Sequence, residues 1–316
     1  MPQPNELFDI RRLAWVIAIG TLALMGAIYL VVFGDPDPEQ TADANAFSAS
    51  AIGHAAFVEI LNRVGLPSYI SRGHSLEKAH GNALLVVAEP PDDDIGHHLL
   101  QQLREVPTAL VILPKRRGTP DPGHPSWLTS TRLIETSGID HLLQEIDPAA
   151  TIRRERGTLQ MPATASGFKA SLDDAQLIYS DVMTPLISRG DKQGGGILLG
   201  KVYLGHALVW VLSDPDLIAN HGLGNGDNAA IAIELVRQAM PVSGTVIFDE
   251  VIHGFAQEAN LLKGLLHLPL LVASIAALCT LIALLLAGSI RFGSPRRLAP
   301  VLAAGKIGRA SCRERV

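Results

Sequence analysis

The stretch ALLVVAEP, residues 83–90, decides the fold. Its apolar residues run without alternation and end before a proline, which is the pattern of a β-strand buried on both faces. TALVILPK, residues 108–115, repeats this pattern, and DDDIGHHLLQQLRE between them is typical of a helix with acidic residues at its positively polarised start. A helix between two buried strands predicts a parallel sheet covered by helices.

The alternation of helix and strand extends to both sides of this unit. The segment SASAIGHAAFVEILNRVG is amphipathic and predicts a helix. Ser48 or Ser50 can cap the start of this helix, and Gly53 belongs to the same capping segment. Residues 116–195 are less regular: SWLTSTRLIETSGIDHLLQEI suggests a helix, and the stretch from Thr151 to Gly196 suggests short strands and loops. We therefore expect one α/β domain over residues 47–256.

The alternation resumes in the last third of the domain. GILLGKVYLGHALVWVLSDP predicts two strands around a turn, and SGTVIFDEVIHG predicts a final buried strand. Between them, NHGLGNGDNAAIAIELVRQAM predicts a glycine-rich loop and a helix capped by Asp227 or Asn228.

Two uncharged apolar stretches flank the domain, residues 13–33 and 268–290. Each would reach roughly 30 Å as a helix, enough to cross the hydrocarbon core of a lipid bilayer. Arginines precede the first stretch and follow the second, so the positive-inside rule predicts a two-pass protein of the bacterial inner (plasma) membrane. Both termini would be cytoplasmic and residues 34–267 extracytoplasmic. A cleaved signal peptide is the alternative for the first stretch.

This interpretation divides the rest of the chain into short segments. We expect a cytoplasmic N-terminus at 1–12, linkers at 34–46 and 257–267, and a truncated cytoplasmic tail at 291–305. The last eleven residues, KIGRASCRERV, match one reading frame of a common sequencing adapter, so residues 306–316 are excluded from functional reasoning.

Composition excludes several classes of function. The net charge is −5 and the domain has no basic cluster, which argues against nucleic-acid binding. Cys279 and Cys312 both lie outside the domain, so it has neither a disulfide framework nor a thiolate nucleophile. The loop GLGNGD, residues 222–227, lacks the spacing of a dinucleotide or Walker motif, and no cofactor is expected.

The end of the last predicted strand gathers Asp249, Glu250 and His253. In a parallel α/β sheet, ligands bind outside the carboxyl ends of the strands. The three side chains could bind a ligand, form hydrogen bonds at the sheet edge, or hold a metal-bound water for hydrolysis. The HExxH spacing of a zinc site is missing, and we expect no metal.

The glycine-rich loop opens a helix, and helix N-termini attract anions. We therefore expect a binding rim in which Asn220, Asp227 and Asn228 join the acidic corner of Asp249, Glu250 and His253. No catalytic residue is assigned.

The chain resembles the bacterial family known as domain of unknown function 4350. The resemblance rests on SASAIGHAAFVEILNRVGLP, LLVVAEP, LGHALVWVLSDPDLIANHGLGNGDNAA and FDEVIHG. It implies a flavodoxin-like domain, similar to class I glutamine amidotransferases, with a mostly parallel sheet, helices on both faces and two flanking transmembrane helices. It also implies membrane-protein partners and a neighbouring MoxR-type AAA+ ATPase. We expect a noncatalytic binding module; the alternatives are a metal-dependent hydrolase and an ABC-transporter accessory protein.

Overall fold

The computed structural model describes residues 41–162, 167–190 and 195–256, with isolated helical positions at 19, 274, 276 and 280. The chain divides into two compact units, Met1–Ala259 and Asn260–Val316. In the second unit, the hydroxyl of Thr280 donates a hydrogen bond to the carbonyl of Ala276, one helical turn earlier. The fold that follows lies in the first unit.

A nine-stranded sheet forms the centre of the first unit, in the order β1-β13-β2-β3-β12-β11-β9-β6, with β10 also paired to β11. Five neighbouring strands are parallel. They are β1 (Ser68–Ser71), β13 (Thr245–Asp249), β2 (Ala83–Ala88), β3 (Thr108–Ile112) and β12 (Ala207–Leu212). The other strands are antiparallel. They are β11 (Ile197–Leu204), β9 (Gln176–Tyr179), β6 (Thr151–Arg154) and β10 (Thr184–Ser188).

The continuous apolar runs fill a core on both faces of the parallel strands. In β2, Leu84 and Val86 pack on one face while Leu85 and Val87 pack on the other, and every residue of the strand is buried. The prediction of a strand buried on both faces is confirmed.

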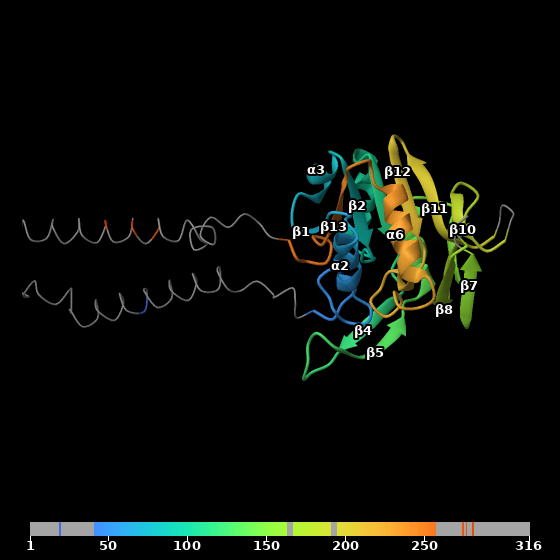
Figure 1. Cartoon of the computed structure of the whole chain (residues 1–316), viewed down its shortest axis with the longest axis horizontal. Helices are drawn as coiled ribbons and strands as arrows, with labels where there is room; N and C mark the ends of the chain where they lie inside the picture. The colour runs from blue at the N-terminus through green and yellow to red at the C-terminus, as the bar shows by residue number, and fades with distance from the viewer. Residues whose placement is uncertain are drawn as a thin grey trace, which may run out of the picture. The chain divides into compact units, whose positions relative to one another are not determined.

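Helices cover both faces of the sheet (Figure 1). On one face lie α2 (Ala55–Arg63) and α6 (Asn228–Ala239). On the other lie α3 (Ser75–Ala79), α4 (Asp94–Gln102) and α5 (Thr136–Gln144). Short 3-10 turns follow α4 (η2, Leu103–Glu105) and β12 (η3, Pro215–Leu217).

Two hairpins lie outside the main sheet. One joins β4 (Arg116–Pro120) to β5 (Leu128–Leu133), and the other joins β7 (Thr158–Pro162) to β8 (Lys169–Asp173). The β7–β8 hairpin packs against α6 and β10. The β4–β5 hairpin is labelled below α2 in Figure 1 and connects β3 to α5.

The predicted fold class, a mostly parallel flavodoxin-like (class I glutamine amidotransferase-like) sheet, is wrong. The sheet is mixed, because β6, β9, β10 and β11 add four antiparallel strands to the five parallel ones. Most of this half comes from the region that looked irregular in sequence. The strands of this region are short, and β6 and β10 are partly exposed, so they lack the long apolar runs of the parallel strands.

The membrane part of the prediction is also corrected. Within residues 41–162, 167–190 and 195–256, no helix is long and apolar enough to cross a membrane. The two-pass inner-membrane location and the flanking transmembrane helices therefore have no support in the described structure. The spans predicted at 13–33 and 268–290 lie outside the described residues apart from the isolated positions. The segments at 1–12, 257–267, 291–305 and 306–316 lie wholly outside them.

The end of the predicted linker at 34–46 belongs to the packed domain. Asn45 and Ala46 are buried, and the backbone N–H of Ala46 donates a hydrogen bond of 2.6 Å to Oε1 of Glu250. A polar sequence can pack here because a buried carboxylate from the far end of the domain satisfies its backbone.

Candidate functional site

The carboxyl ends of the five parallel strands meet at one edge of the sheet. At this edge β3 and β12 are neighbours, yet the chain after β3 leads to α5 on one face and the chain after β12 leads to α6 on the other. A crevice opens where neighbouring strands diverge in this way, and ligands of open α/β sheets bind there.

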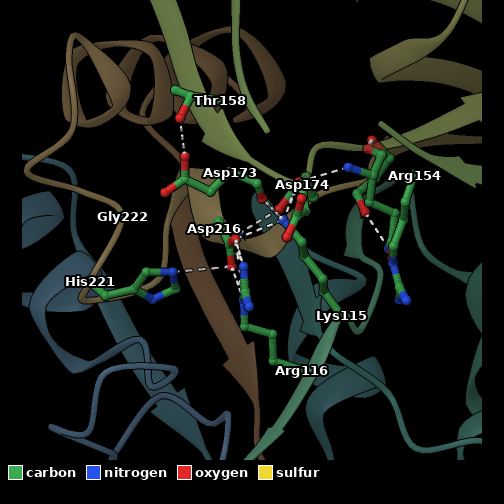
Figure 2. A network of polar contacts seen from close by, with 12 residues as sticks. Lys115, Arg116, Arg154, Thr158, Asp173, Asp174, Asp216, His221 and Gly222 are labelled. Atoms are coloured by element: carbon green, nitrogen blue, oxygen red, sulfur yellow. Dashed lines mark hydrogen bonds and ion pairs between the residues drawn. The ribbon is translucent and has the colours of Figure 1, made fainter. Parts of the chain in front are cut away.

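A buried lysine lies at this point of divergence (Figure 2). Lys115 follows β3, and its Nζ lies 2.7 Å from Oδ2 of both Asp214 and Asp216, which follow β12. Its third hydrogen bond, of 2.8 Å, goes to the carbonyl of Asp173 at the end of β8. All three donors of the ammonium group are used, so the lysine is fully satisfied although no part of its side chain is exposed.

The two aspartates differ in their environment. Burial raises the pKa of Asp214 to about 6, against the opposing charge of Lys115. Burial also acts to raise the pKa of Asp216, but hydrogen bonds from His221, Arg116 and Lys115 outweigh it and hold that pKa well below its ordinary value. Arg116 Nη2 lies 3.0 Å and His221 Nε2 lies 3.3 Å from this carboxylate. The charged groups of this network pair with one another, and their contacts hold the ends of β3 and β12 together.

Sequence reasoning missed this network. The two carboxylates stand 99 and 101 positions after Lys115, so no local motif connects them. The available signal was a charged residue within three positions of the end of each of two buried strands, in LPK and SDPD.

The predicted acidic corner is present at the end of β13, but its carboxylates point to different neighbours. Asp249 Oδ1 accepts hydrogen bonds from the hydroxyl of Ser75, at 2.7 Å, and from the N–H of Val251. Glu250 Oε2 lies 2.7 Å from His253 Nδ1, while its Oε1 holds Ala46. In the described part of the chain, no group of three histidine, cysteine or acidic side chains is placed to hold a metal ion.

Burial and charge shift the pKa values in this corner. Burial raises the pKa of Asp249. Burial acts to lower the pKa of His253, but the hydrogen bond and the negative charge of Glu250 outweigh it, so the pKa of His253 is raised. The contact with Glu250 therefore favours the protonated form of His253.

Glu89 is a second site residue that sequence reasoning missed. It follows β2 directly, its φ is 48°, and its side chain is almost fully buried. Its Oε1 lies 3.0 Å from Nε2 of His54, and its carbonyl oxygen lies 3.3 Å from Nε2 of His253. A left-handed backbone conformation costs a residue other than glycine about 1–3 kcal/mol, and residues strained in this way are frequent at ligand-binding and active sites. The sequence signal was a glutamate between a buried strand and two prolines.

The other predicted rim residues brace loops. Asn220 donates hydrogen bonds to the carbonyls of Ser48 and Ser50 and accepts one from the N–H of Ala56. Asp227 stands at the N-cap position of α6, but its carboxylate accepts from the N–H of Lys169 instead of capping the helix.

Asn228 is fully buried and exchanges hydrogen bonds with the backbone of Ser171 in β8. Together Asn220, Asp227 and Asn228 fasten the loop before α6, and no described contact joins them to the acidic corner. The single six-residue rim of the prediction is therefore two separate groups.

The predicted capping of α2 by Ser48 or Ser50 is wrong. The helix begins at Ala55, after His54, and the hydroxyl of Ser48 donates to Ser50, whose own hydroxyl donates to the carbonyl of Ala42. The backbone carbonyl of Ser48 and the side chain of Asn220 satisfy the first helical N–H groups instead. Gly53 lies tightly against Ser48, where an added Cβ would stand 2.1 Å from its carbonyl oxygen.

A cleft of about 970 Å³ opens at this edge of the sheet. It is lined by the ends of β2 and β3, the β4–β5 hairpin, the start of α5 and the loop after β13. Glu89, Arg117, Arg132, Ser137 and His253 are among the lining residues. Of the six predicted rim residues, His253 alone lines this cleft, while Asp249 lines a second cavity of about 620 Å³ beside α3 and α4.

Comparison with known proteins adds little to this geometry. No protein-family model and no curated protein matches the chain. Among solved structures, the chain is similar to a beta-galactosidase from Bacillus circulans sp. alkalophilus, with 12% sequence identity and a TM-score of 0.26. The match covers 51% of this chain and 23% of that one. Similarity at this level supports no conclusion about fold or function, and the class of protein defined by the structure is a mixed α/β domain with a cleft at the carboxyl edge.

Proposed function

We propose that the protein is a noncatalytic binding module whose ligand occupies the cleft at the carboxyl edge of the sheet. The observation that carries this proposal is the state of the polar groups around the cleft. Glu89 and His253 both line the cleft, and each is already paired, Glu89 with His54 and His253 with Glu250. These two groups are therefore engaged in contacts that hold the fold. A general base needs a free lone pair within reach of substrate.

The rival function, a metal-dependent hydrolase that uses Asp249, Glu250 and His253, has weaker support. The carboxylate of Asp249 is turned to Ser75 near α3, and the carboxylate of Glu250 is turned to His253 and Ala46. Ligands of one metal ion must converge on a point about 2 Å from each donor atom, and these side chains diverge.

A binding experiment on the full chain tests the proposal. Thermal unfolding is followed with millimolar citrate, inorganic pyrophosphate, glucose or arginine, which cover the two charge signs and a neutral ligand. A ligand that binds only the folded state raises Tm. The matched control is Ser137→Trp, which fills the cleft from an exposed position.

We expect at least one probe to raise Tm in the wild type and to lose this effect in Ser137→Trp. If no probe raises Tm, or if every effect persists in Ser137→Trp, the cleft does not bind ligands of these classes and the proposal is wrong. The Tm of Ser137→Trp without ligand shows whether the variant is folded.

A further inference from the structure

We infer that the cleft selects a small ligand with at least two negative charges, held between Arg117 and Arg132. This inference rests on the proposed function and names the chemical class of the ligand. It begins from the strand register of the β4–β5 hairpin, in which these two arginines are direct partners.

Direct partners in an antiparallel pair point to the same face of the ribbon, with Cβ atoms roughly 4.5–5.5 Å apart, and like charges in this arrangement are destabilising. Both arginines are exposed and both line the cleft. The hairpin therefore presents two guanidinium groups side by side to the cleft, at a cost in stability that a bound anion would remove.

The neighbouring arginine shows what a structural role looks like in the same hairpin. Arg116 precedes Arg117, so its side chain leaves the ribbon on the opposite face. It also lines the cleft, but its guanidinium group is already paired with Asp216 at 3.0 Å. Within residues 41–162, 167–190 and 195–256, neither Arg117 nor Arg132 has an ion-pair partner. The Arg116–Asp216 pair anchors the start of the hairpin to the sheet edge, next to the two unpaired arginines.

The start of α5 lies in the same cleft and adds donors for an anion. Ser137 and Gly138, in its first turn, line the cleft, and the N-cap residue Glu135 makes no capping hydrogen bond with its side chain. The first N–H groups of a helix have no partners within the helix and favour negative charge. This helix end supplements the arginine pair and is not the basis of the inference.

Acidic side chains also line the cleft, and most of them are already paired. Asp92 lies 3.0 Å from His97, Asp93 caps α4, and Glu89 is paired with His54. Asp43 and Glu135 line the cleft without an ion-pair partner in the described part of the chain. They give a cationic ligand a place to bind, so the experiment must separate the two charge signs.

Guanidinium chemistry sets the ligand class. The planar group donates two parallel N–H bonds to a carboxylate or phosphate, and such pairs are short and charge-assisted. Two adjacent groups match a ligand with two carboxylates or with a diphosphate.

Isothermal titration of the full chain with citrate and with inorganic pyrophosphate tests this inference. We expect binding to weaken about tenfold or more in Arg117→Gln and in Arg132→Gln, because each loses one charge-assisted pair. Arg237→Gln, which changes an exposed arginine of α6 outside the cleft, should bind as the wild type does.

A second readout excludes a purely structural role for the two arginines. Without ligand, each glutamine variant should be as stable as the wild type or slightly more stable, because the like-charge contact is relieved. A loss of Tm in both variants without ligand would contradict the inference.

The remaining outcomes separate this inference from the proposed function. If citrate or pyrophosphate binds equally to wild type and both arginine variants but not to Ser137→Trp, the cleft binds ligands and the arginine assignment is wrong. If arginine or glucose binds while neither anion does, the ligand class is wrong and the binding module stands. If none of the four probes binds, both proposals fail.

Discussion

The ammonium group of Lys115 lies 2.7 Å from the carboxylate of Asp214, with neither side chain exposed to solvent. This contact joins the end of β3 to the end of β12, the neighbouring strands from which the chain departs to opposite faces of the sheet. The ion pair therefore holds the ends of these two strands together, directly before the start of the β4–β5 hairpin at Arg116.

The first prediction concerns this ion pair. Replacing Lys115 by methionine leaves Asp214 and Asp216 buried with less compensating charge, and breaking one side of a buried pair costs about 3–5 kcal/mol. We expect a loss of this size in the free energy of unfolding, measured by urea denaturation. If the variant is too unstable to purify, Lys115→Met combined with Asp214→Asn should recover part of the loss, because it removes one unpaired charge.

The control for this variant is Lys201→Met on β11, whose lysine is partly exposed and has no ion-pair partner in the described structure. Its free energy of unfolding should stay within about 0.5 kcal/mol of the wild type. Equal effects at Lys115 and Lys201 would mean that the network does not hold the two strands together.

The second prediction is a pH dependence that arises at His253. The pKa of this histidine is raised above its ordinary value of 6.5 in the folded protein. The folded state therefore holds the proton more tightly than the unfolded chain, and the resulting stability is complete below pH 6.5 and is lost as pH rises through the folded pKa. We expect the free energy of unfolding to fall as pH rises above 6.5.

The His253→Gln variant should show a smaller fall over this pH range, because the titrating group is gone while a donor to Glu250 is kept. His221 and His97 also have raised pKa values, so part of the dependence should persist in the variant. Denaturation series from about pH 6 to pH 9 on wild type and variant make the comparison. Identical pH slopes would contradict the role assigned to the Glu250–His253 pair.

The parts of the fold that could be predicted from the sequence are those that depend on local patterns, and the parts that depend on pairing between distant segments could not be predicted. The apolar runs at 83–90, 108–115 and 245–248 predicted β2, β3 and β13, because each run is local and its burial on both faces leaves a direct pattern. In the antiparallel half, β11 was predicted as one of two strands around a turn, but strands such as β6 and β10 were not placed, because they are partly exposed and short. These strands belong to the sheet because β6 pairs with β9 and β10 pairs with β11, and such pairing leaves no local pattern in the sequence.

The site followed the same rule. The acidic corner was visible because Asp249, Glu250 and His253 are close in sequence, and the structure keeps Glu250 and His253 in contact. The Lys115–Asp214 pair and the Arg117–Arg132 pair depend on strand order and register, which the sequence did not disclose. Asn220 was expected to face a ligand, but its amide instead donates hydrogen bonds to the backbone carbonyls of Ser48 and Ser50.

The third prediction concerns the close contact at Gly53. An added Cβ would stand 2.1 Å from the carbonyl oxygen of Ser48, which is backbone and cannot rotate away. We expect Gly53→Ala to lower the free energy of unfolding by about 1–3 kcal/mol, as overpacking in a tight site does. Gly224→Ala is the matched control because a Cβ there meets nothing within 4 Å. Chemical denaturation of both variants measures the two free energies of unfolding. Equal values for Gly53→Ala and Gly224→Ala would show that the backbone at Gly53 is not tightly packed against Ser48.

The fourth prediction tests whether Asn220 braces the loop before α2 or faces a ligand. Its amide donates at 2.9 Å to Ser48 and at 2.6 Å to Ser50, and its oxygen accepts from Ala56 at 3.0 Å. Removing it leaves the N–H of Ala56 without its partner, and the carbonyls of Ser48 and Ser50 each lose one of two donors. An unsatisfied backbone group of this kind costs about 1–3 kcal/mol. We expect Asn220→Ala to lower Tm clearly, while Asn225→Ala, at an exposed position of the same loop, should change it little.

A variant that keeps the wild-type Tm but loses binding of citrate or pyrophosphate would instead place Asn220 in the ligand site, because a bracing residue acts on stability first.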